Sequence, residues 1–148
     1  MPCLDTTEHV LDAKFRAVLP ASVRPLYLDG GVLTLWAGPC LAVFTPGAFA
    51  DWRDVVTGQL AESKFEDAGA HVRYVSARSA PFKVDVQGRF IVPDRLRQAA
   101  AIERTITITG AGNRMELWSS AIYHGSVDVA EMEQNITFLQ ATYDLPRS

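Results

Sequence analysis

Short apolar runs rich in β-branched residues fill the first 45 positions of the chain and predict β-strands. These runs cover Glu8–Leu11, Ala17–Leu19, Val32–Trp36 and Leu41–Phe44. Pro20 would stop strand pairing and suits the first turn of a helix, which is expected over Ala21–Leu26. Thr45 and Pro46 then form a helix start, with the threonine as N-cap and the proline at the first helical position.

The same order of elements recurs in the second half of the chain. Asp12 and Arg16 match Asp85 and Arg89 at an offset of 73 residues, and each motif lies between two apolar runs. The second copy predicts strands at Phe82–Val84, Phe90–Val92, Thr105–Thr109 and Met115–Trp118, a helix over Asp94–Ala100, and a helix start at Ser119 and Ser120. Matched features in one order indicate a tandem internal repeat, and the alternation of strands with short helices indicates an α+β fold.

Helical periodicity marks the segments outside the two copies. Four positions share one face of a helix: Phe49, Trp52, Val56 and Leu60. A second helix is expected around residues 65–75, and the C-terminal segment has an apolar stripe from Met132 to Tyr143. That stripe packs either on its own domain or against a neighbouring subunit. The chain therefore divides into a first repeat (5–49), a helical linker (50–80), a second repeat (81–123) and a C-terminal helix or tail (124–148).

Composition is that of a globular protein, with 48% hydrophobic and 21% charged residues. No apolar run reaches the ~18 residues of a membrane span, and the N-terminus lacks a signal-peptide pattern, so we expect a cytoplasmic protein. The net charge of −3 counts against nucleic-acid binding. Residues 71–104, however, hold seven basic and three acidic side chains, which could form a local positive face.

Enzyme, metal and cofactor chemistry have no recognisable motif in this chain. Cys3 and Cys40 are expected to be reduced thiols, the second of them in a core strand. The three histidines are not at ligand spacing, so no zinc site is expected: His9, His71 and His124. The three tryptophans lie in apolar elements and are expected in the core or at a subunit interface: Trp36, Trp52 and Trp118.

The two Asp–Arg motifs are the strongest candidates for a functional site, and two interpretations compete. A hairpin turn that presents Arg16 or Arg89 could enter the DNA major groove, where arginine bonds guanine or phosphate. Alternatively, each arginine bonds its own aspartate and holds the turn. Lys14 and Gln87 lie beside the arginines and favour DNA contact. Asp12 and Asp85 are expected to be structural, since a carboxylate repels phosphate but accepts N–H bonds within a turn.

These motifs, together with the run DVQGRFIVPDRLRQAA and the later ITGAGNRMELWSSAIY, resemble the MraZ family of bacterial transcriptional regulators, related to AbrB-type DNA-binding proteins. The resemblance covers residues 8–124. It implies tandem swapped-hairpin β-barrel units with flanking helices, and a ring-like homo-oligomer associated with the nucleoid. It also implies binding to repeated promoter sites in double-stranded DNA near cell-division and cell-wall genes. By motif position, the DNA-facing residues are Lys14, Arg16, Gln87 and Arg89.

One position departs from the family pattern, because Phe15 stands where the second motif has Gly88. Phenylalanine is strained at positive φ, so we expect either a reshaped first turn with Phe15 packed inward or between subunits, or an exposed Phe15 that wedges against DNA. A reshaped turn would make Arg16 less important than Arg89. The acidic charge and Phe15 also leave open a homo-oligomeric interaction module that has lost DNA binding. Arg24 and Arg97 are expected on a solvated helix face.

Overall fold

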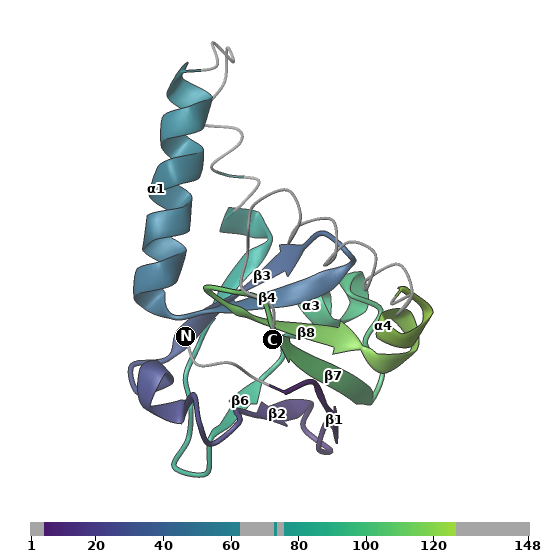
Figure 1. Cartoon of the computed structure of the whole chain (residues 1–148). Coiled ribbons are helices and arrows are strands. Elements are labelled where there is room, and N and C mark those ends of the chain that lie inside the picture. Colours follow the sequence, from purple (N-terminus) through teal and green to yellow (C-terminus); the bar gives the residue numbers. More distant parts are fainter. Residues whose placement is uncertain (1–4, 63–72, 74–75, 127–148) are drawn as a thin grey trace, which may run out of the picture.

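The computed structural model describes residues 5–62, 73 and 76–126 (Figure 1). Its main element is a six-stranded antiparallel sheet with the order β1-β7-β8-β4-β3-β5, and β2 and β6 pair separately as a two-stranded ribbon. The strands are β1 (Thr7–Val10), β2 (Arg16–Val18), β3 (Gly31–Trp36), β4 (Cys40–Phe44), β5 (Ser79–Phe82), β6 (Arg89–Ile91), β7 (Thr105–Gly110) and β8 (Met115–Ser119). The helical elements are η1 (Arg24–Tyr27), α1 (Pro46–Glu62), α3 (Asp94–Ala99) and α4 (Ser120–Ser126). The predicted α+β class is therefore confirmed.

The strand order of the large sheet reflects the repeat in the sequence. The 73-residue offset relates β1 to β5 and β3 to β7, and β4 occupies the place of β8, so the order reads the same from either edge. The first strand of each copy pairs with the third strand of the other copy: β1 pairs with β7, and β5 pairs with β3. β2 and β6 also pair with each other. The two copies thus share one sheet that neither could complete alone.

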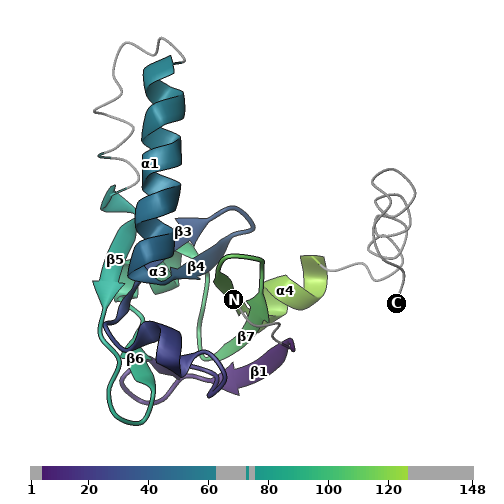
Figure 2. The same ribbon diagram turned by 60° about the vertical axis from the view of Figure 1, so that its left-hand side comes forward.

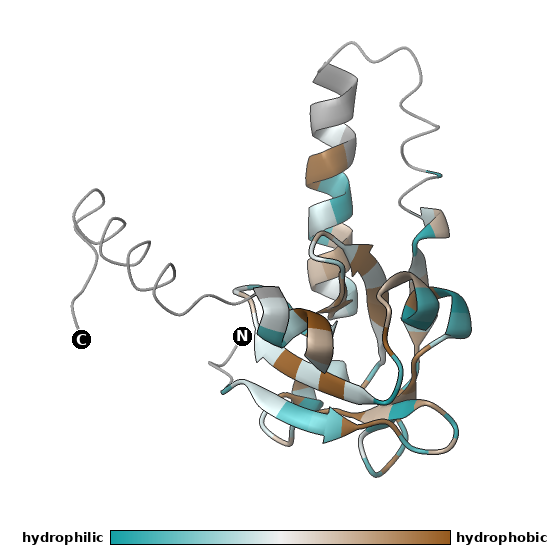
Figure 3. Ribbon diagram, turned by 90° about the vertical axis from the view of Figure 1, so that its right-hand side faces the viewer, coloured by the Kyte–Doolittle hydropathy of each residue, from teal (hydrophilic) through white to brown (hydrophobic). Residues whose placement is uncertain are grey.

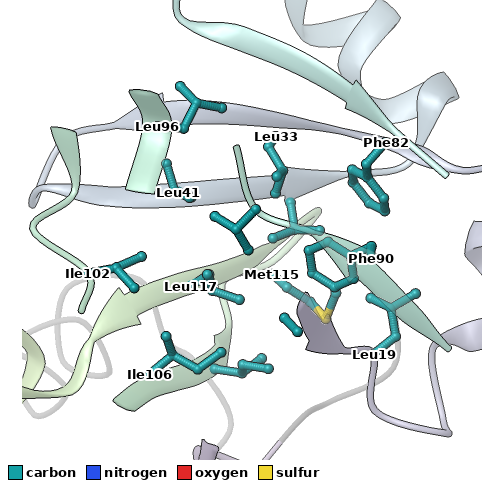
Figure 4. Packing of buried hydrophobic residues seen from close by; sticks show 14 of the residues in the cluster. Leu19, Leu33, Leu41, Phe82, Phe90, Leu96, Ile102, Ile106, Met115 and Leu117 are labelled. Carbon is teal, nitrogen blue, oxygen red and sulfur yellow. The ribbon is translucent and has the colours of Figure 1, made fainter. Parts of the chain in front are cut away.

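The hydrophobic core lies between the large sheet and a layer made by the ribbon, η1 and α3 (Figure 4). Hydrophobic and more polar residues alternate along parts of the strands, as the brown and pale positions in Figure 3 show, and the hydrophobic cluster contains alternate residues such as Ile106 and Ile108 of β7. Phe82 of β5 and Phe90 of β6 meet there with ring centroids 4.7 Å apart. The buried Tyr27 hydroxyl donates a hydrogen bond to the carbonyl of Val43 at 2.8 Å. The core therefore ties the ribbon firmly to the sheet.

The other face of the large sheet is covered by α1 and α4. Thr45 is the N-cap of α1 as predicted, since its Oγ1 accepts the N–H of Ala48 at 3.2 Å. Trp52 lies 5.2 Å from Trp36 and 5.9 Å from Phe44, measured between ring centroids, and Phe49 joins this aromatic cluster. Beyond these contacts α1 extends away from the sheet, at the opposite end of the molecule from the ribbon (Figures 1 and 2).

The second copy repeats this arrangement with α4. Trp118 packs on Tyr123 with ring centroids 5.9 Å apart, and the Thr107 and Ser120 hydroxyls are 2.9 Å apart. Trp36, Trp52 and Trp118 are all half-buried in such clusters. Cys40 is fully buried in β4 as expected, and burial raises the pKa of its thiol to about 12. Cys3, the side chain of Leu60, the second linker helix and the C-terminal stripe lie outside the described residues.

Two predicted elements differ from the structure. The helix expected over Ala21–Leu26 is a four-residue 3₁₀ helix, η1, because Pro25 has no N–H to donate and its ring disfavours an α conformation for the preceding residue. The strand expected at Phe82–Val84 begins earlier and ends at Phe82. It pairs with β3 along Ser79–Phe82, and Pro81 is tolerated because β5 is an edge strand.

The ribbon offers a matched test of this packing, because neighbouring residues of β6 face opposite ways. Phe90 is 2% exposed and Ile91 is 59% exposed. Phe90→Ala should reduce the free energy of unfolding by ~3–5 kcal/mol, since it removes a large buried side chain. Ile91→Ala, the control, should stay within ~0.5 kcal/mol of the wild type. Urea unfolding followed by circular dichroism measures both; equal effects would contradict the assigned inward face of β6.

Candidate nucleic-acid interface

The two Asp–Arg motifs form turns with the same hydrogen bonds. In the first turn, Asp12 Oδ1 accepts the backbone N–H groups of Lys14 and Arg16, both at 2.9 Å. The carbonyl of Asp12 accepts the N–H of Phe15 at 2.9 Å. In the second turn, Asp85 Oδ1 accepts the backbone N–H groups of Gln87 and Arg89, both at 2.9 Å. The carbonyl of Asp85 accepts the N–H of Gly88 at 3.0 Å. Each aspartate thus accepts two backbone N–H groups of its own turn and holds the turn in this conformation.

Each motif arginine also bonds its own aspartate. Arg16 Nε lies 2.6 Å from Asp12 Oδ2, and Arg89 Nε lies 2.7 Å from Asp85 Oδ2. The backbone N–H of the arginine is the main cause that lowers the pKa of each carboxyl group, and the arginine side chain adds to it. A guanidinium has five N–H donors, and among the described residues only the one on Nε makes a hydrogen bond in each of these arginines. The two interpretations of the arginines are thus compatible, because four donors on the Nη atoms remain for a ligand.

The expectation that Phe15 reshapes the first turn is wrong. Phe15 adopts φ +57° where Gly88 adopts φ +80°, and both turns keep the same hydrogen bonds. The inward packing expected for Phe15 is present, since its side chain is half-buried against the core. Two guanidinium groups lie over its ring: the Cζ atoms of Arg97 and Arg104 are 3.9 Å and 4.3 Å from the ring centroid. These contacts offset the strain of a phenylalanine at positive φ.

The ribbon between the turns presents arginines and aliphatic residues on one face. Arg16 pairs with Ile91 and Val18 pairs with Arg89, while Ala17 and Phe90 point into the core between them. Strand alternation therefore forces the four outer side chains onto the same surface. Val18 and Ile91 are 39% and 59% exposed.

Sequence analysis missed these two aliphatic residues. The strand period of two is the signal that could have identified them, because it places Val18 and Ile91 on the same side of their strands as Arg16 and Arg89. Both turns lie next to this face, at the end of the molecule opposite α1 (Figures 1 and 2). Lys14 and Gln87 are exposed, and Val86 at the tip of the second turn is fully exposed. All four predicted contact residues are thus brought to one end of the protein.

Two further arginines differ from expectation. Arg97 is not on a solvated face, because its side chain is 15% exposed and lies on Phe15. Arg24 is half-buried, and its Nε donates to the carbonyl of Leu19 at 3.0 Å. In the basic segment, Arg95 donates to the carbonyl of Ser79 at 2.8 Å. Part of the positive charge in residues 71–104 therefore serves the fold rather than the surface.

The described residues contain no cluster of three or more potential metal-ligating side chains. None of the helices among them has the length and apolar character that a membrane crossing would require.

The fold and site define an antiparallel α+β repeat protein with paired Asp–Arg turns, and comparison with known proteins identifies the family. Residues 79–140 match the family model described as "MraZ protein, putative antitoxin-like". The chain is 32% identical to a transcriptional regulator MraZ from Thermoanaerobacter pseudethanolicus, over 83% of this chain and 87% of that protein. Proteins of the same name from Leuconostoc mesenteroides and Kocuria rhizophila are 30% and 34% identical, over 93% and 81% of this chain and 95% and 82% of their own length. The chain belongs to the MraZ family.

The lowered pKa values of Asp12 and Asp85 predict how the turns respond to acid. A carboxyl group whose pKa is lower in the folded state stabilises that state above its unfolded pKa, here 3.8, and this contribution disappears as the pH falls through the folded value. A variant with both Asp12→Asn and Asp85→Asn should therefore be less stable than the wild type at neutral pH, and the difference should shrink below pH 3.8.

Urea unfolding over a series of pH values measures this difference. Lys14→Gln is the control, because it keeps the backbone N–H that Asp12 accepts and should change stability little at any pH. A difference between the double variant and the wild type that does not depend on pH would show that the carboxylates do not stabilise the turns through their charge.

Proposed function

We propose that this protein is a sequence-specific DNA-binding transcriptional regulator that contacts repeated promoter sites through the ribbon and its two turns. The relatives named above are called transcriptional regulators, which supports the regulatory role. The observation that carries the DNA-binding surface is the pair of identical turns that place Arg16 and Arg89 on one exposed face. Repeated promoter sites near cell-division and cell-wall genes are the proposed targets, and the nucleoid is the proposed location.

The dimensions and chemistry of the ribbon suit the major groove. That groove is about 12 Å wide and admits a two-stranded β-ribbon. The Nη donors of Arg16 and Arg89 can bond guanine O6 and N7 or phosphate oxygens, and the exposed Val18 and Ile91 can contact thymine methyl groups. Lys14 and Gln87 lie beside the arginines and add a phosphate partner and an amide for base edges. The surface thus combines affinity for the backbone with groups that discriminate bases.

We further propose that residues 5–49 and 81–123 form a pair of swapped-hairpin units, joined by the linker 50–80 and followed by the tail 124–148. One protomer has a net charge of −3 and offers few phosphate contacts. Several protomers in a ring would repeat the two turns along DNA, and the high effective concentration of linked sites would raise affinity without new contacts. Repeated sites in the DNA would match repeated ribbons in the oligomer.

The net charge favours one alternative, a homo-oligomeric interaction module that has lost DNA binding. In that case the arginines would serve the turns only, through the Nε bonds to Asp12 and Asp85. Salt-dependent retention on promoter DNA separates the two functions, because counterion release accompanies only phosphate binding. Footprinting on the DNA upstream of the protein's own gene would locate the sites.

Substitution of either motif arginine should weaken DNA binding. Arg89→Ala and Arg16→Ala should each cost ~1–3 kcal/mol, or ~5- to 150-fold in affinity, because each removes a potential bidentate contact. The two effects should be similar in size, since the two turns have the same hydrogen bonds. Gel-shift titration at fixed salt measures them. Arg53→Ala on α1 removes the same charge far from the ribbon and should leave affinity nearly unchanged.

The oligomer has its own test. Light scattering at micromolar concentration should give a mass of several times 16.2 kDa. A monomer mass with intact DNA binding would contradict the oligomer alone. An oligomer that fails to bind promoter DNA at low salt would contradict the DNA-binding function and leave the interaction module.

A further inference from the structure

Two arginines outside the motifs lie against the turns, and each belongs to the other copy of the repeat. Arg24 begins η1, just after Pro20 in the first copy, and Arg97 lies in α3, just after Pro93 in the second. The guanidinium of Arg97 lies on the ring of Phe15, in the first turn. The guanidinium of Arg24 lies so close to Gly88, in the second turn, that a Cβ added at that glycine would overlap it. The contacts therefore cross between the copies.

Backbone hydrogen bonds follow the same crossed pattern. The carbonyl of Phe15 accepts the N–H of Val92, which follows β6, at 3.0 Å. The carbonyl of Gly88 accepts the N–H of Leu19, which follows β2, at 2.9 Å. The positive-φ residue of each turn is thus bonded to the strand end of the other copy. The arginine of that other copy then covers it.

The space beside the positive-φ residue is filled differently in the two turns. In the second turn, glycine adopts positive φ without a side chain, and the space it leaves is filled by Arg24. In the first turn, Phe15 fills that space itself, and Arg97 stacks on its ring. Arg104 adds a second guanidinium over the ring and donates from Nη1 to the carbonyl of Asp12 at 2.8 Å. Both turns are held, one by close approach and one by stacking.

The hydrogen bonds and burial of Arg97 hold its side chain within the protein, against the first turn. Its Nη2 lies 3.2 Å from a carboxylate oxygen of Asp94, and its Nη1 donates weakly to the carbonyl of Ile102 at 3.5 Å. Its Nε is buried and has no hydrogen-bond partner among the described residues, which fits a guanidinium face pressed against a ring. A side chain that is 15% exposed and bonded in this way has little left to offer a ligand.

We propose that Arg24 and Arg97 are positioning residues that act crosswise: Arg97 fixes the turn that presents Lys14 and Arg16, and Arg24 fixes the turn that presents Gln87 and Arg89. Neither touches the nucleic acid. Their effect on recognition rests on the DNA-binding function proposed above, whereas their effect on the turns does not need DNA. The first experiment below therefore tests the positioning alone, and the second tests its consequence.

Amide hydrogen exchange of the free protein measures the stability of each turn separately. Arg97→Ala should speed exchange of the Lys14 and Arg16 amides, which bond Asp12, by ~10-fold, and leave the Gln87 and Arg89 amides unchanged. Arg24→Ala should show the reverse pattern. The central amides of β7 report global stability and serve as the internal control. Faster exchange in the turn of the same copy, or equally in both turns, would overturn the proposal.

Conservative variants keep this test decisive if an alanine variant does not fold. Arg97→Lys keeps the charge but loses the planar group that stacks on Phe15, so the first turn should still exchange faster. Phe15→Gly provides a second check. In that background Arg97→Lys should have a smaller effect on the first turn than in the wild type, because the ring on which the planar group stacks is gone. Arg24→Ala should act as before on the second turn.

The DNA experiment uses double-mutant cycles on the affinity for a promoter fragment. Arg97→Ala should weaken binding ~5-fold or more in the wild type but little in Arg16→Ala, and its effect should remain complete in Arg89→Ala. Arg24→Ala should show the opposite dependence. The slope of log affinity against log salt should not change with Arg97→Ala, since a lost phosphate contact would reduce it by ~0.9.

Each outcome bears on a different claim. Equal effects of Arg97→Ala in both arginine backgrounds, with a reduced salt slope, would mean that Arg97 contacts DNA directly and would overturn the positioning role. A wild-type protein that binds no DNA, but whose turns exchange crosswise as described, would refute the proposed function and support the positioning role.

Discussion

The pairing of β2 with β6 is the interaction on which the rest of the candidate interface depends. Once these two strands pair, Ala17 and Phe90 occupy the same side and face the core. Because successive side chains of a strand point to opposite faces, the flanking positions of both strands then lie on the outer surface. A shift of one residue in the register would bury the arginines and expose Phe90. Such a shift would destabilise the fold, because the burial of Phe90 would be lost and two charged groups would be removed from water. The outward orientation of the two half-buried arginines is thus a consequence of core packing.

Much of this architecture could be predicted from the sequence, because its strongest signals are local. The Asp–Arg spacing predicted both turns, and Thr45 before Pro46 predicted the start of α1. Short apolar runs predicted the eight strands, with shifts at their ends. The helix expected over Ala21–Leu26 was too long and of the wrong type, because apolar periodicity does not take account of Pro25, which disfavours an α conformation for Arg24.

The partners that come from the other copy could not be predicted in this way. Phe15 was expected to change its turn because phenylalanine alone is strained at positive φ. The stack with Arg97, from a helix about 80 residues later, offsets that strain. Arg24 and Arg97 were expected on a solvated face because only the short helix of their own copy was considered. A pattern within one copy cannot show that its arginine contacts the other, because the exchange of strands brings them together.

That exchange also has a consequence for how the chain is made. β1 pairs with β7, whose residues are added to the growing chain about 100 residues later, which corresponds to roughly 5–20 s of synthesis. During that interval the first strand leaves the ribosome without the partner it will have in the finished protein. Its sequence, Thr-Glu-His-Val, is largely polar and exposed even in the final sheet. The strand that remains unpaired during synthesis is therefore polar enough to stay in contact with water, and this limits its tendency to pair with other nascent chains.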